Sequence, residues 1–94
     1  MLYWSGTLLK MIYSVSIKQS AAKALEKVEW EDRLRIIAAI DQLKINPAAG
    51  GVLKGEFSGL RRIRIGSYRV VYEVQDQRLV VLVIRIGHRR EVYR

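Results

Sequence analysis

The chain has 94 residues and no cysteine, and half of its residues are hydrophobic. This length allows one small domain, and the apolar fraction is too high for a disordered chain. The absence of cysteine excludes disulfides and thiolate metal sites, and no apolar run reaches the roughly 20 residues that a membrane-spanning helix needs. We therefore expect one small globular domain, located in the cytoplasm.

The positive charge is concentrated in the second half of the chain. Seventeen Lys and Arg oppose nine Asp and Glu, which gives a net charge of +8. Residues 1–53 carry seven cations and five acids, whereas residues 54–94 carry ten cations and four acids. Nine of these ten cations are Arg, whose planar guanidinium can bind phosphate through two hydrogen bonds. The composition therefore favours a phosphate-rich partner such as a nucleic acid.

Residues 1–10 do not fit the pattern of the rest of the chain. They resemble neither a complete signal peptide nor a strand, and we interpret them as an extension from an upstream start or as a loose arm. Apolar and polar residues alternate over residues 11–18, which predicts a half-buried strand. Residues 11–94 are therefore expected to form the folded domain.

Two helices are predicted after this strand. Ser20 is the expected N-cap of the first, which runs to Val28, and Trp30 is expected in the turn that follows. The second is predicted over residues 31–45 and ends before Pro47, because proline disfavours helical backbone in the residue before it. Its apolar residues recur at helical spacing and are expected in the core; they are Ile36, Ile37, Ile40 and Leu43.

Three strands are predicted in the last part of the chain. A glycine-rich loop over residues 48–59 precedes strands over residues 60–65, 68–75 and 78–86. Gly66-Ser67 and Asp76-Gln77 are the expected tight turns between them. This order predicts an α+β fold. The N-terminal strand and the three-stranded antiparallel meander are expected to form one curved antiparallel sheet, with the helical hairpin on one face.

Arginines alternate with apolar residues in the predicted strands. Successive residues of a strand point to opposite faces, so Arg62 and Arg64 share one face and Ile63 points to the other. On the next strand the same alternation separates Arg69 from Tyr68 and Val70. Guanidinium groups cannot be buried under the helices without partners, so these three arginines are expected to share the uncovered face. Like charges on neighbouring strands repel each other, which favours an anion-binding surface. The simpler alternative is that they are solvated side chains that discourage edge pairing.

Three segments resemble the RelE/ParE toxin superfamily, and specifically its RelE-like branch. They are Leu53-Lys54-Gly55, the run from Leu60 to Gly66 followed by Tyr68-Arg69-Val70-Val71-Tyr72, and Ile86-Gly87-His88-Arg89-Arg90-Glu91-Val92-Tyr93. The combination of YRVVY and GHRREVY at this separation is specific, whereas either motif alone is weak. The resemblance covers residues 11–94 and implies a RelE-like fold.

The resemblance implies a toxin of a type II toxin–antitoxin system. Such toxins are endoribonucleases that cleave mRNA in the ribosomal A site and inhibit translation. They use no metal or cofactor. In their reaction a ribose 2′-OH attacks the adjacent phosphate and leaves a 2′,3′-cyclic phosphate and a 5′-OH. The implied partners are a cognate antitoxin, mRNA and ribosomal RNA, and no membrane is expected as a partner. The toxin–antitoxin complex is expected to bind operator DNA.

This reaction needs cations around the phosphate and groups that move protons. The candidate catalytic residues that fit this chemistry are Arg62, Arg64, Arg69, His88, Arg89 and Tyr93. The arginines stay protonated and are expected to act electrostatically. The proton carriers are expected among His88, since an imidazole exchanges protons near neutral pH, and Tyr93, whose equivalent in similar toxins stacks on the substrate base.

A second group of cations is expected to bind RNA without taking part in the chemistry. Lys54, Arg61 and Arg90 are the predicted contacts to the RNA backbone. Arg85 and Arg78 are interpreted as solvated residues or as contacts to ribosomal RNA.

Two other functions fit the same fold. A ParE-like inhibitor of DNA gyrase would act by binding, without phosphodiester chemistry. The co-facial arginines and the Arg89 and Tyr93 terminus argue against it, because that branch usually lacks them. A relative that only binds its antitoxin or operator DNA would cause no growth arrest.

Overall fold

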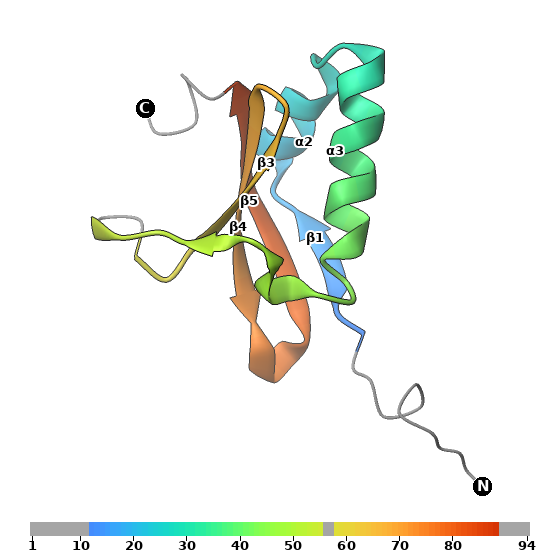
Figure 1. Ribbon diagram of the computed structural model, residues 1–94. Coiled ribbons are helices and arrows are strands. Elements are labelled where there is room, and N and C mark those ends of the chain that lie inside the picture. The colour runs from blue at the N-terminus through green and yellow to red at the C-terminus, as the bar shows by residue number, and fades with distance from the viewer. Residues whose placement is uncertain (1–11, 56–57, 89–94) are drawn as a thin grey trace, which may run out of the picture.

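The computed structural model describes residues 12–55 and 58–88, which form a five-stranded sheet and two helices (Figure 1). The elements are β1 (Ser14–Ile17), α2 (Gln19–Glu26), α3 (Trp30–Gln42), β2 (Gly51–Val52), β3 (Arg61–Ile65), β4 (Tyr68–Gln75) and β5 (Val80–His88). Short 3-10 helices, Pro47–Ala49 and Asp76–Arg78, precede β2 and β5. This order confirms the predicted α+β fold. The predicted extension, residues 1–10, lies outside the described residues.

The strands lie in the order β1-β5-β4-β3-β2. β3, β4 and β5 form the predicted antiparallel meander. β1, however, pairs with β5 in parallel, so the sheet is mixed and the expectation of a wholly antiparallel sheet is wrong. Alternation of side chains does not encode strand direction. Direction depends on the helical hairpin, which returns the chain to the start of β1, where the Tyr13 N–H donates to the Lys44 carbonyl at 2.8 Å.

The first helix begins earlier than predicted. Lys18 occupies the N-cap position, and no side chain caps the helix, so the expected capping role of Ser20 is wrong. The reason is the end of the β1–β5 ladder. The Lys18 N–H donates to the Val83 carbonyl at 2.9 Å, and the chain turns from strand directly into helix, which leaves Ser20 inside the first turn.

Both helices cover the same face of the sheet (Figure 1), and the core lies between them and β4 and β5. The buried α3 side chains, Ile36 and Ile40, belong to one cluster with the strand residues Val70, Tyr72, Val81 and Val83. Ile37 is 47% exposed, so its predicted place in the core is wrong. One helical residue rotates the side chain by about 100°, which turns Ile37 away from the sheet. No helix within the described ranges is long and apolar enough to cross a bilayer.

The glycine-rich segment is fixed to the sheet by Tyr72. The fully buried Tyr72 hydroxyl donates to the Pro47 carbonyl at 2.7 Å and accepts the Gly50 N–H at 2.9 Å. A Cβ at Gly50 would lie only 2.6 Å from the Arg62 carbonyl oxygen, so a larger residue does not fit. This close approach sets the start of β2, a strand in a region that the sequence predicted as a loop.

Candidate functional site

Four arginines lie on the sheet face that points away from the helices. Arg64 is the register partner of Arg69, and Arg62 is the partner of Val71. On the other side of β4, Val71 is the partner of Arg85. Register partners project from the same face of a sheet, and Arg62 and Arg64 are two residues apart on one strand, so all four side chains share one face. We call Arg62, Arg64, Arg69 and Arg85 the arginine face.

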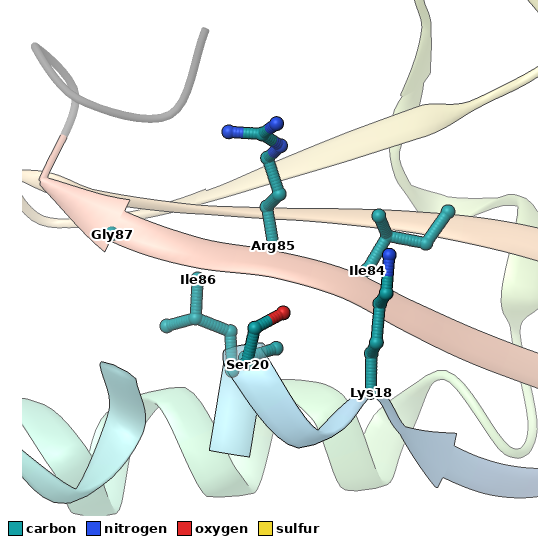
Figure 2. Close-up of a pocket in the computed structure, with 7 residues that line it drawn as sticks. Lys18, Ser20, Ile84, Arg85, Ile86 and Gly87 are labelled. Carbon is teal, nitrogen blue, oxygen red and sulfur yellow. The ribbon is translucent and has the colours of Figure 1, made fainter. Parts of the chain in front are cut away.

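The helix-covered side provides an independent check on this assignment. Ile63 and Val70 are register partners, Val70 and Ile86 are register partners, and all three pack in or against the core. Figure 2 shows the Ile86 side chain pointing toward α2 and the Arg85 side chain pointing away from it. The predicted sharing of one face by Arg62, Arg64 and Arg69 is therefore confirmed.

The arginine face includes a buried valine and a glycine. Val71, between Arg62 and Arg85 in register, is only 1% exposed, and the long aliphatic stems of arginines can cover such a residue while their charged ends stay in water. Gly87 is the β5 partner of Arg69. Because glycine has no side chain, Gly87 adds no side chain beside Arg69 on this face.

On β4 the arginine face also includes an acid, Glu73, two residues beyond Val71. Its carboxylate accepts a hydrogen bond from the Gln75 side-chain amide at 2.7 Å. Its register partner is Leu82, not an arginine. The positive charge is therefore concentrated at the β3–β4 hairpin end of the sheet, and the acid lies toward the opposite end.

The structure does not group His88 with the arginine face. His88 is the register partner of Tyr68, and the two rings meet edge to face, with centroids 5.9 Å apart and an interplanar angle of 76°. Both line a cavity of about 350 Å³ together with Ala24 of α2 and with Lys27 and Val28, which follow this helix. The sheet thus separates His88 from the arginines. The sequence could have indicated this position. Ile86 and His88 are two residues apart, so on one strand they point to the same face. The predicted strand, however, ended at residue 86, whereas β5 continues to His88.

Arg61 also lies on the helix side of the sheet, on β3 between β4 and β2. Its register partner is the buried Tyr72, and its guanidinium donates to the Gly50 carbonyl at 2.7 Å and to the Ala48 carbonyl at 3.4 Å. These bonds hold the segment before β2 in place. The predicted contact of Arg61 with RNA backbone stays a prediction, and its visible role is to support the fold.

Of the remaining predicted site residues, the structure describes only Lys54. Lys54 is exposed and lies just after β2, in a segment that projects to the side away from the helices (Figure 1). Arg89, Arg90 and Tyr93 lie outside the described residues. Their assigned roles stay predictions.

Sequence reasoning gave too little weight to Arg85. It was grouped with solvated residues, yet it is one strand away from Arg62 on the arginine face. A register shift between Val71 and Tyr72, where β5 has one extra residue, obscures strict alternation along the strand. The local pattern Ile84-Arg85-Ile86 still resembles the alternation in β3 and could have indicated this position.

Three comparisons with known proteins agree with one another. A family model described as ParE toxin of type II toxin–antitoxin system, parDE, matches residues 15–93. Toxin RelG of Mycobacterium tuberculosis is 29% identical over 90 residues, which cover 89% of this chain and 99% of RelG.

Solved structures share the fold. An archaeal RelE–RelB complex from Pyrococcus horikoshii has 30% identity and a TM-score of 0.72, with 87% of this chain and 100% of that chain covered. A mutant of the Escherichia coli toxin RelE in the free state has 28% identity and a TM-score of 0.71, with 83% and 84% covered.

Proposed function

Because this chain belongs to the ParE toxin family of type II toxin–antitoxin systems, we propose that it is a toxin that cleaves mRNA on the ribosome without a metal. The observation that carries this proposal is the arginine face, in which four guanidinium groups from three neighbouring strands share one side of the sheet. A toxin that only inhibited a protein would not need this concentration of phosphate-binding groups.

In the proposed reaction the ribose 2′-oxygen attacks the adjacent phosphorus and the bond from phosphorus to the 5′-oxygen breaks. The 2′-OH loses its proton and the departing 5′-oxygen gains one, so the products are a 2′,3′-cyclic phosphate and a 5′-OH. Negative charge accumulates on the phosphorane oxygens between these states. Guanidinium groups that are already in position stabilise this charge without reorganisation of the site.

The geometry supports a division of labour among the arginines. Arg64 and Arg69 are directly opposed, and this pair is proposed to bind the scissile phosphate. Arg62 and Arg85 flank the buried Val71 and are proposed to hold neighbouring phosphates of the RNA backbone. The proposed roles of Arg89 in charge stabilisation and of Tyr93 in base stacking and proton transfer rest on the sequence motif.

His88 was a candidate for proton transfer, and its position favours another role. It packs against Tyr68 on the helix side, so it would have to pass the end of the sheet to reach a phosphate on the arginine face. We assign it as a positioning residue, which fixes the end of β5 from which the C-terminal motif continues. Lys54 and Arg90 are proposed to contact RNA backbone.

The proposed partners follow from the reaction and from the family. They are mRNA in the ribosomal A site and ribosomal RNA, in the cytoplasm, and a cognate antitoxin that inhibits the toxin. Several relatives were solved as toxin–antitoxin complexes, including the RelE–RelB complex from Pyrococcus horikoshii. The complex of this chain with its antitoxin is proposed to bind operator DNA.

A cleavage assay tests the nuclease proposal. Purified chain is mixed with ribosomes programmed with a defined mRNA, and the new 5′ ends are mapped. We expect cuts within translated codons and products with 5′-OH ends. Activity should not fall when EDTA is added, provided that enough magnesium remains to keep the ribosomes intact. The double variant Arg64→Ala, Arg69→Ala should lose cleavage, whereas Arg78→Ala, an exposed arginine between β4 and β5, should keep it. Cleavage by the double variant would overturn the proposed site.

Inhibition of DNA gyrase is the second candidate, because the matching family model is described by the ParE toxin. It predicts a different result with the same preparation. The chain would inhibit gyrase-dependent supercoiling of a relaxed plasmid and leave the ribosome-bound mRNA intact. Running both assays in parallel decides between the two functions.

A further inference from the structure

The outer side of α3 carries a line of exposed apolar side chains. Trp30 and Leu34 are 63% and 47% exposed, and Ile37 is as exposed as Leu34. Their spacing of four and three residues places them on one side of the helix. Asp41, four residues beyond Ile37, continues the line and is also exposed. We call Trp30, Leu34 and Ile37 the α3 stripe, and such a grouped apolar surface marks an interaction site.

The described part of the chain begins beside the C-terminal end of this helix (Figure 1). The Tyr13 N–H donates to the Lys44 carbonyl at 2.8 Å, and Lys44 lies two residues beyond the last residue of α3. Ile12 and Ile45, on the two sides of this junction, are both exposed apolar residues. The chain that precedes residue 12 therefore enters next to the end of α3.

The sequence of residues 1–11, which we call the N-terminal segment, complements the stripe. The segment lies outside the described ranges, and it contains Trp4, Leu8 and Leu9 and one charged side chain, Lys10. From residue 10 back to residue 4 the order is a cation, two leucines and a tryptophan. From Asp41 back to residue 30 the line on α3 is an acid, two aliphatic residues and a tryptophan. A parallel alignment therefore pairs opposite charges and brings apolar residues together.

The length of the segment matches the stripe. An α-helix rises about 1.5 Å per residue, so Lys44 and Trp30 lie roughly 20 Å apart along this helix. Trp4 is eight residues before Ile12, which corresponds to roughly 26 Å of extended chain at about 3.3 Å per residue. Trp4 can therefore reach Trp30, and the leucines between them can reach the middle of the stripe.

We propose that the N-terminal segment packs on the α3 stripe of its own chain, with Lys10 beside Asp41. The Asp41 carboxylate pairs with the Lys44 ammonium at 2.9 Å and stays mostly exposed, so a second cation can approach it. Packing removes apolar surface of both partners from water. A second copy of the chain fits less well, because three side chains cover far less than the roughly 800 Å² per partner that a stable interface buries.

Tryptophan fluorescence of the whole chain tests this packing, because Trp4 and Trp30 are its two tryptophans. In a Trp4→Phe background, Trp30 alone reports whether the stripe is covered. Adding Leu8→Asp and Leu9→Asp should raise the acrylamide quenching constant of Trp30 about twofold, because its ring returns from apolar contact to water.

The matched control adds the same charges as Ser5→Asp and Thr7→Asp, spares the apolar side chains and should retain the protection. Disulfide formation distinguishes packing from a general loss of structure, since the chain has no cysteine. Leu9→Cys with Ile37→Cys should oxidise within one chain, because packed side chains bring the Cβ atoms to about 4 Å. Leu9→Cys with Arg35→Cys should not, because the exposed Arg35 projects about 200° around the helix from Ile37.

The outcomes do not depend on whether the chain cleaves mRNA. Equal quenching in the Trp4→Phe chain and its double aspartate variant overturns the inference, as does a Leu9→Cys, Ile37→Cys pair that stays reduced. Protection that increases with chain concentration, or disulfides between two chains, identifies a second copy as the occupant and overturns it. Protection that appears only with the co-expressed antitoxin bound identifies the antitoxin as the occupant and also overturns it.

Discussion

Arg64 lies directly opposite Arg69 at the hairpin end of the β3–β4 ladder. The Cβ atoms of such partners are about 5 Å apart, and like charges at this position destabilise the pair. Folding therefore accepts a repulsion that binding of a phosphate would relieve. If the proposed function is correct, a phosphate bound at the arginine face should stabilise the hairpin.

Replacing one member of this pair should separate stability from activity. Arg64→Gln is expected to leave the free energy of unfolding unchanged or to raise it by about 0.2–1 kcal/mol, because the repulsion is lost. Ribosome-dependent cleavage should fall by at least about 100-fold, the scale reported for loss of one preorganised charge-stabilising group. Urea unfolding and the cleavage assay measure the two effects, with Arg78→Gln as the control. A variant that is both less stable and fully active would contradict the prediction.

The buried hydroxyl of Tyr72 should matter for folding. Tyr72→Phe removes the bonds to the Pro47 carbonyl and the Gly50 N–H, and each buried group left without a partner costs about 1–3 kcal/mol. We expect this variant to unfold at a clearly lower urea concentration. Tyr13→Phe is the matched control, since the Tyr13 hydroxyl donates to Asp76 at an exposed position. Equal losses in the two variants would show that the Tyr72 bonds are not the main anchor.

Gly50 should not tolerate even one added methyl group. The Cβ of Gly50→Ala would meet the Arg62 carbonyl oxygen and the Tyr72 hydroxyl, each at 2.6 Å, and such overpacking costs about 1–3 kcal/mol. Gly51→Ala is the control, because nothing lies within 4 Å of its added Cβ. Thermal unfolding should rank Gly50→Ala well below Gly51→Ala, and a reversed order would contradict the described packing.

Stability should decline at alkaline pH through the tyrosines. Burial raises the pKa of Tyr72, although the Gly50 N–H and the positive charge of Arg61 oppose this effect. The hydrogen bond to Asp76, together with a smaller effect of burial, raises the pKa of Tyr13.

A raised folded-state pKa means that the folded chain holds the phenolic proton more tightly than the unfolded chain. The resulting stabilisation is complete below the unfolded tyrosine pKa of about 10 and is lost as the pH rises through the folded value. Urea unfolding across this range should show a smaller decline for Tyr72→Phe than for the unmodified chain. Identical declines would exclude Tyr72 as a source of the alkaline sensitivity.

The pH dependence of cleavage should reveal the role of His88. If His88 only positions the end of β5, His88→Gln will lower the rate but keep the shape of the pH–rate profile. If it transfers a proton, the same variant will remove a titration step from the profile. Single-turnover rates from pH-controlled ribosome assays distinguish these results, and we expect the shape to be retained.

Much of the secondary structure could be predicted from the sequence. Apolar alternation identified β4 as Tyr68–Gln75, with the same bounds as observed, and it placed Arg62, Arg64 and Arg69 on one face. Helical spacing identified Ile36 and Ile40 as core. These features depend on local periodicity, which the chain carries residue by residue.

Errors occurred where a distant contact replaced a local preference. Ser20 is not a cap because the β1–β5 ladder continues to Lys18. β2 exists because Tyr72 holds Gly50 against the sheet. None of these contacts can be seen in the pattern of neighbouring residues.

The sequence by itself determined the order of the two helices and of strands β1, β3, β4 and β5, the alternation that points three arginines to one side, and the motifs that mark the family. Only the tertiary structure decided that β1 runs parallel to β5, that Arg85 joins the arginine face and that His88 lies on the other side of the sheet. The physical reason is that periodicity fixes the direction of side chains within one strand. Pairing register, strand direction and a register shift between strands decide which residues from different strands meet.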